Sequence, residues 1–212
     1  MFDLKKIIKD IFVKSVRNFE CYISGQSEYK FINADFDVEE DQLIKDNFTA
    51  KKLLKEIKKI LSDHYSVQIE FPVVLEVVSD SRKVAFEWKE DGVGKYHSQI
   101  MMSEKYHMIY ILAGLTKYKF CAIIAHELMH AFLYEKKLFI QNQFFREAMA
   151  RWMEYHILIF YGMKDQALKL LEIKEPDRGG NLYKLIELDN QIGYKSLIPF
   201  LIEKQQEFYS EL

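Results

Sequence analysis

The chain is poor in the residues that mark cross-linked, collagen-like or linker proteins. Its 212 residues include 2 cysteines, 3 prolines and 8 glycines. So little glycine and proline excludes collagen-like and linker-like chains. Cys21 and Cys121 form neither a CxxC pair nor a disulfide framework. This is consistent with a reducing, intracellular setting, and we expect a cytoplasmic protein.

Charge of one sign and long apolar runs are also missing. Lys and Arg number 30 against 32 Asp and Glu, for a net charge of -2. We therefore expect neither a nucleic acid nor a membrane surface as partner. No run reaches the roughly 18 apolar residues of a membrane helix, and residues 1–13 alternate charged and apolar side chains, unlike a signal peptide. The hydrophobic share, 49%, is ample for a buried core.

The expected elements run from helices through a small sheet to further helices. Hydrophobic spacing predicts helices over 3–20, 42–63, 118–136, 144–161, 165–172, 182–191 and 197–209. Alternation and β-branched residues predict strands over 67–78, 83–89 and 96–102. We expect Gly162 to cap the helix over 144–161 and Pro199 to lie in the first turn of the last helix. The fold class is α+β, as one domain over 1–212: N-terminal helices with a small, largely antiparallel sheet in 1–115, and a helical half in 116–212.

One motif carries chemistry. His126 and Glu127 begin an HExxH pattern that His130 completes, inside an expected amphipathic helix with apolar neighbours. Residues four apart lie nearly over one another on a helix, so both imidazoles can point at one ion. Zinc lowers the pKa of its bound water toward about 7, and Glu127 can accept that proton. We therefore expect Zn²⁺ as cofactor.

A catalytic zinc needs a third protein ligand and an open fourth position. The candidates downstream are Glu135, Glu147, Glu154, His156, Asp165 and Glu172. We favour Glu147, because an antiparallel return after residues 139–143 brings the first turn of its helix toward the histidines. Its other interpretation is an ion pair with Arg151, four residues on. Glu154 and His156 remain alternatives for the ligand.

These residues resemble a known family. Ile124–Ala131 (IAHELMHA), with Glu147 following His130 after a 16-residue gap, is similar to the peptidase domain of the plant LIM-domain growth-limiting metallopeptidases and their stand-alone bacterial relatives. Segments 111–115 (ILAGL) and 193–197 (GYKSL) add to the resemblance, which covers roughly residues 97–212. Arg146 and Ala148 depart from it, because the family has an acidic residue and a glycine there. The family's LIM and ubiquitin-interacting segments have no counterpart in this chain.

The resemblance implies a gluzincin-type, zincin-like metallopeptidase. Its zinc ligands would be His126, His130 and Glu147, Glu127 would be the catalytic base, and a small sheet would pack on the active-site helix. Such enzymes hold an extended peptide along an edge strand, for which residues 96–102 are the candidate.

We therefore expect a zinc-dependent metalloendopeptidase that hydrolyses peptide bonds in a peptide or protein substrate. The oxyanion needs a donor besides zinc, and the candidates are His156, Arg178, Tyr183 and Tyr194. Two alternatives stay open: an antirepressor-type regulatory protease, and a non-catalytic domain with a structural zinc. The intact Glu127 argues against the second alternative, since a structural site has no use for a base.

Overall fold

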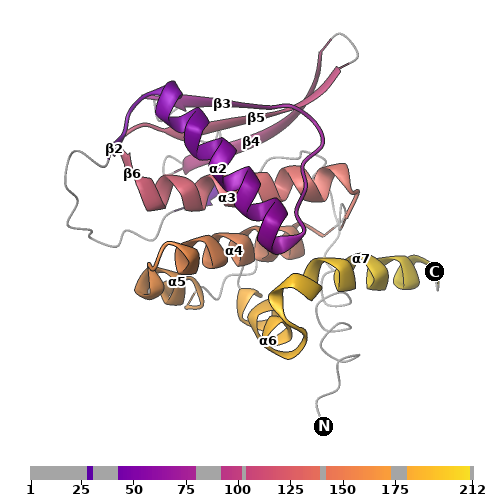
Figure 1. The fold of residues 1–212 in the computed structure, drawn as a ribbon. Coiled ribbons are helices and arrows are strands. Elements are labelled where there is room, and N and C mark those ends of the chain that lie inside the picture. Colours follow the sequence, from indigo (N-terminus) through magenta and orange to yellow (C-terminus); the bar gives the residue numbers. More distant parts are fainter. Residues whose placement is uncertain are drawn as a thin grey trace.

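The computed structural model describes residues 28–30, 43–79, 92–101, 104–138, 142–172 and 181–210. Within them, six helices accompany a four-stranded and a two-stranded sheet, which confirms the α+β class. The sheet lies at the top of Figure 1, with the helical majority beneath it. The expected helix over 3–20, the expected strand over 83–89 and Arg178 fall outside the described residues.

The larger sheet is mixed but mostly antiparallel, as expected. Its strands lie in the order β1 (Glu28–Lys30), β4 (Gly92–Met101), β5 (Glu104–Leu112) and β3 (Val73–Val78). β4 is antiparallel to both of its neighbours, whereas β3 and β5 are parallel. Parallel neighbours require a long connection, and the segment between β3 and β5 includes the whole of β4.

The candidate edge strand over 96–102 is part of β4, which has neighbours on both sides only at its beginning among the described residues. β5 pairs with it from Gly94 to Met101, and β1 pairs with its beginning, where Glu28 is opposite Lys95 and Lys30 is opposite Gly92. The edges of the sheet, in the part of the chain described, are β1 and β3. The pairing with β1 joins segments more than sixty residues apart, so no local pattern could predict it.

The first well-described helix begins later than expected. Residues 43–44 form β2 (Leu43–Ile44), which pairs with β6 (Leu115–Thr116), rather than the first turn of a helix over 42–63. The helix is α2 (Asn47–Tyr65), and Asp46 caps it by accepting hydrogen bonds from the backbone N–H groups of Phe48 and Thr49, both at 2.8 Å. An acidic N-cap satisfies donors that would otherwise be unpaired, which fixes the start of the helix.

α3 (Lys117–Glu135) lies beneath the sheet, and α4 (Gln143–Phe160) lies beneath α3 (Figure 1). Every residue from Phe120 to Leu133 is buried, because the sheet, α2 and α4 all pack against this helix. Over these residues the helix is therefore buried on all sides, as the apolar neighbours of the motif indicated, and is not amphipathic. The polar side chains of the HExxH motif consequently sit in the interior of the molecule.

The C-terminal helices are α5 (Lys164–Leu170), α6 (Leu182–Ile192) and α7 (Tyr194–Ser210). Gly162, with φ 76°, follows the C-cap of α4, as expected. Pro199 lies inside α7 and not in its first turn, because α7 starts directly after Gly193. With φ 83°, Gly193 turns the chain between the two helices within a single residue. None of the described helices is long and apolar enough to cross a membrane.

Candidate metal centre

His126 and His130 lie one turn apart on α3, and their Nε2 atoms are 3.2 Å apart. The helix that holds them has defined ends. Thr116 caps its start by accepting a hydrogen bond from the N–H of Lys119 at 3.4 Å. Its end is closed by Lys137, whose φ of 53° lets the N–H of Leu138 return to the carbonyl of Leu133 at 2.8 Å.

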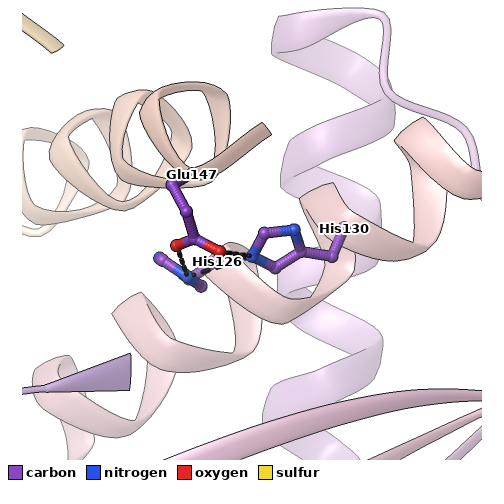
Figure 2. Close-up of side chains that lie close together, drawn as sticks. All are labelled: His126, His130 and Glu147. Atoms are coloured by element: carbon purple, nitrogen blue, oxygen red, sulfur yellow. Dashed lines mark hydrogen bonds and ion pairs between the residues drawn. The ribbon is translucent and has the colours of Figure 1, made fainter. Parts of the chain in front are cut away.

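Glu147 reaches the histidines from α4 (Figure 2). Asn142 starts this helix by accepting a hydrogen bond from the N–H of Phe145 at 2.9 Å, which places Glu147 in its second turn. Oε2 of Glu147 lies 3.7 Å from Nε2 of His126, and Oε1 lies 3.6 Å from Nε2 of His130. The structure thus brings together the three residues that the sequence favoured as ligands.

The three side chains form a buried group that could hold a metal ion. One ligand atom from each lies within 4.8 Å of the others, and the residues are 0%, 6% and 4% exposed in chain order. Burial is the main cause that holds the pKa values of His126 and His130 well below the usual histidine value, so both rings are neutral. A cation in this group could be ligated by one nitrogen of each ring and one oxygen of Glu147.

Glu127 is fully buried next to the group but is not a member of it. It faces β4 at Gly94, where a Cβ atom would come within 3.1 Å of Oε1 of Glu127 and 2.5 Å of Cγ2 of Ile123. Glycine is therefore required for the strand to pass this close to the helix. Gly94 was not identified from the sequence, since a glycine in a strand becomes informative only when its tertiary neighbour is known.

Glu154, an alternative third ligand by sequence, takes a different place. Its Oε2 atom lies 3.4 Å from Nδ1 of His126, whereas Glu147 approaches Nε2 of the same ring. The same oxygen accepts a hydrogen bond from Nη1 of Arg151 at 3.0 Å. Arg151 thus pairs with Glu154, and Glu154 contacts the outer side of a ligand ring instead of joining the metal group.

His156 lies in a separate cluster. Its Nε2 atom donates to Oδ2 of Asp189 at 2.8 Å, and the indole N–H of Trp152 donates to the same oxygen at 3.3 Å. The rings of Tyr65 and Tyr194 pack against His156 at centroid distances of 5.2 and 6.0 Å. The cluster joins α2, α4, α6 and α7, so His156 has a packing role and is not placed as the third ligand.

The remaining candidates are not brought to the metal group by the described contacts. Tyr194 belongs to the cluster around His156, and Tyr183 is 52% exposed on α6. Glu135 accepts hydrogen bonds from the backbone N–H groups of Glu70 and Phe71, both at 2.8 Å. Asp165 is exposed on α5, and Glu172 is exposed just after this helix.

A second buried network was not foreseen from the sequence. His107 of β5 is 1% exposed; its Nε2 atom lies 2.7 Å from Oε1 of Glu135, and its Nδ1 atom lies 3.0 Å from the hydroxyl of Tyr96. Burial lowers the pKa of His107 and outweighs the opposing effect of Glu135, so the neutral ring donates to Glu135 and accepts from Tyr96. The ring of Tyr96 stacks on His130 at 6.3 Å and 19°. In the sequence, the only sign that His107 is buried was its place in the alternating pattern of β5.

Comparison with known proteins finds no matching family model, no matching curated sequence and no matching solved structure. The resemblance drawn from Ile124–Ala131 and Glu147 therefore stays a prediction. The case for a function depends on the geometry of the site alone.

Proposed function

We propose that the chain is a zinc-dependent peptidase. The observation that supports this most directly is the spacing of the three possible ligand atoms. The two Nε2 atoms are 3.2 Å apart, Oε1 of Glu147 lies 3.6 Å from that of His130, and Oε2 of Glu147 lies 3.7 Å from that of His126. One ligand atom from each residue lies within 4.8 Å of the others. Ligands at tetrahedral angles around a zinc ion, with bonds of about 2.0–2.1 Å, lie about 3.3–3.4 Å apart. The group is therefore close to the arrangement that zinc requires.

The donor set supports zinc and an open site. Two imidazole nitrogens with one carboxylate are typical of catalytic zinc, whereas calcium and magnesium prefer oxygen ligands alone. A structural zinc site has four protein ligands, and the metal group among the described residues has three members. A fourth position would remain for water or substrate. This argues for the catalytic alternative over the structural one.

Glu127 is the residue we assign as general base and acid. It follows the ligand His126 in α3, and its side chain is enclosed between that helix and Gly94 of β4. A bound zinc ion would polarise the scissile carbonyl and increase the acidity of a water molecule. The carboxylate of Glu127 takes the proton of that water and then delivers it to the leaving amine. Glu154 lies 3.4 Å from Nδ1 of His126, on the side of the ring where a carboxylate can orient a ligand histidine.

Metal analysis and hydrolysis test the proposal together. The purified chain should contain about one zinc per molecule by elemental analysis and should cleave a fluorogenic peptide mixture. Glu147→Ala should lose most of the metal. Glu127→Gln should keep the metal but hydrolyse about 10²- to 10⁴-fold more slowly, because only the proton acceptor is removed.

Glu172→Ala and Glu172→Gln are the matched controls, since Glu172 is an exposed glutamate that follows α5. Both should leave metal content and hydrolysis unchanged. Full activity in Glu127→Gln would disprove the assigned mechanism, and full zinc retention in Glu147→Ala would disprove the ligand set. A regulatory protease would share this whole site and would differ only in recognising one protein partner.

A further inference from the structure

Arg146 carries a positive charge beside the metal group. Its guanidinium forms no ion pair with a described carboxylate. Arg146 directly precedes Glu147 in α4. Its Nε atom is buried and, among the residues the structure describes, has no hydrogen-bond partner. Arg151 of the same helix is different, because Glu154 neutralises it at 3.0 Å. A partly buried cation that forms no ion pair with a described carboxylate is costly, so Arg146 is suited to binding an anion.

The charge of Arg146 acts on the metal group itself. After burial and the neighbouring His126, Arg146 is the next cause of the lowered pKa of His130. Burial also lowers the pKa of Arg146, while Glu147 and Tyr96 oppose that effect. Glu147 lies on α4 and Tyr96 lies on β4, so the guanidinium interacts electrostatically with residues of both elements.

The charge balance of the site favours an anionic ligand. The two carboxylates of Glu127 and Glu147 would balance a divalent ion, and Arg151 is balanced by Glu154. Arg146 is then the cation left over among the described residues around the group. A guanidinium offers two parallel N–H donors that match the two oxygens of a carboxylate.

We propose that Arg146 binds a carboxylate of the peptide substrate, either its C-terminal carboxylate or an Asp or Glu side chain close to the scissile bond. This inference rests on the proposed function and names its substrate class. Because Arg146 adjoins the ligand Glu147, the bound carboxylate would lie about one or two substrate residues from the scissile bond. A free C-terminus would make the enzyme a carboxypeptidase, whereas an acidic side chain would give an endopeptidase with acidic specificity.

The test measures binding and does not depend on hydrolysis. Three short peptides with an N-terminal hydroxamate, which ligates zinc, differ only in their charge: one has a free C-terminal carboxylate, one a C-terminal amide, and one a C-terminal amide with a glutamate side chain. Calorimetry gives their affinities for the zinc-loaded wild type, Arg146→Met and Arg146→Lys. Lys169→Met, which removes a positive charge from an exposed position of α5, is the matched control.

The wild type should bind one of the two carboxylate peptides about 10- to 100-fold more tightly than the uncharged amide. Arg146→Met should bring that ratio to about 1, Arg146→Lys should keep part of it, and Lys169→Met should keep all of it. Equal binding of all three peptides by the wild type would overturn the proposal. An affinity ratio as large in Arg146→Lys and Arg146→Met as in the wild type would also overturn the proposal. If Arg146→Met does not fold, an undiminished ratio in Arg146→Lys overturns it.

The metal-free protein separates this inference from the proposed function. The same three peptides should keep their order of affinity there at higher concentration, because Arg146 and not the metal selects the carboxylate. Absence of zinc or of hydrolysis in the wild type would contradict the proposed function alone. Absence of the carboxylate preference in the metal-free and zinc-loaded forms would contradict the role of Arg146 alone.

Discussion

The carboxylate of Glu154 lies 3.4 Å from Nδ1 of His126, while Glu147 approaches Nε2 of the same ring at 3.7 Å. One imidazole therefore lies between two glutamates of α4, seven residues apart. A carboxylate on the outer nitrogen fixes the tautomer of a ligand histidine and raises its basicity. Glu154→Gln should consequently weaken zinc binding about 10- to 100-fold, as measured by competition with a chelator.

Glu154→Gln also removes the partner of the buried Arg151, so it should lower the free energy of unfolding by about 3–5 kcal/mol. The double variant Arg151→Gln with Glu154→Gln leaves neither charge of this pair buried alone, and it should regain most of that stability without regaining zinc affinity. If the double variant also regained the affinity, Glu154 would act through the stability of α4 and not through His126.

Gly94 controls the fit of β4 against Glu127. In Gly94→Ala the added Cβ would meet Ile123 at 2.5 Å and Glu127 at 3.1 Å, so both side chains must shift. We expect a loss of about 1–3 kcal/mol of stability and a fall in hydrolysis of about 10- to 100-fold, with zinc content unchanged. Metal analysis beside peptide hydrolysis and denaturant unfolding measures these effects.

Gly114→Ala is the matched control. A Cβ there meets nothing within 4 Å, although the φ of 85° disfavours alanine. This variant should lose about 1 kcal/mol and keep its rate of hydrolysis. If Gly94→Ala hydrolysed peptides as fast as Gly114→Ala, the close approach of the strand would have no part in placing Glu127.

Asp189 should matter for the helical half and not for the metal group. It accepts hydrogen bonds from both Trp152 and His156, and Asp189→Ala would leave both donors without their partner. We expect this variant to lose about 2–4 kcal/mol in denaturant unfolding while it retains about one zinc per chain. Asp165→Ala, at an exposed position of α5, should change neither quantity. Loss of zinc in Asp189→Ala would mean that the cluster around His156 supports the ligands.

The part of the site that the sequence predicted is the part set by local spacing. His126 and His130 are one helical turn apart wherever the helix lies, and a short connection returns α4 to them so that Glu147 is within reach. The contact of Glu154 with His126 depends on how α4 is rotated against α3. That rotation follows from packing along the full length of both helices, which spacing within one helix does not reveal.

The long-range strand pairs could not be predicted from the sequence for the same reason. Leu43 and Ile44 carry the apolar spacing of the helix that comes after them, yet they pair with β6, some seventy residues away. The capping side chain of Asp46 marks the true start of α2, and it was the signal that could have separated strand from helix. Tyr96 and His107 become neighbours only through the register of β4 and β5, in which Tyr96 is opposite Ile109.

His107 should make the stability of the fold depend on pH. Its contact with Glu135 favours the protonated ring, but burial outweighs this and lowers the pKa below 6.5. The unfolded chain therefore takes up a proton at this residue as the pH falls below about 6.5, whereas the folded chain does not. The stabilisation is complete above that pH, and it is lost as the pH falls toward the lower pKa of the folded state.

Comparison with His107→Gln measures this contribution, since glutamine can donate to Glu135 and accept from Tyr96 but does not titrate. The metal-free forms are used, because His126 and His130 then titrate alike in both proteins and cancel in the difference. Unfolding in denaturant from about pH 8 to about pH 5 should show a constant difference in free energy above about pH 7. Below that pH the wild type should lose stability relative to the variant, by at most about 1.4 kcal/mol per pH unit. Parallel curves would show that the pKa of His107 is the same in both states, and a wild type that gains stability as the pH falls would show that the ion pair with Glu135 overcomes the effect of burial.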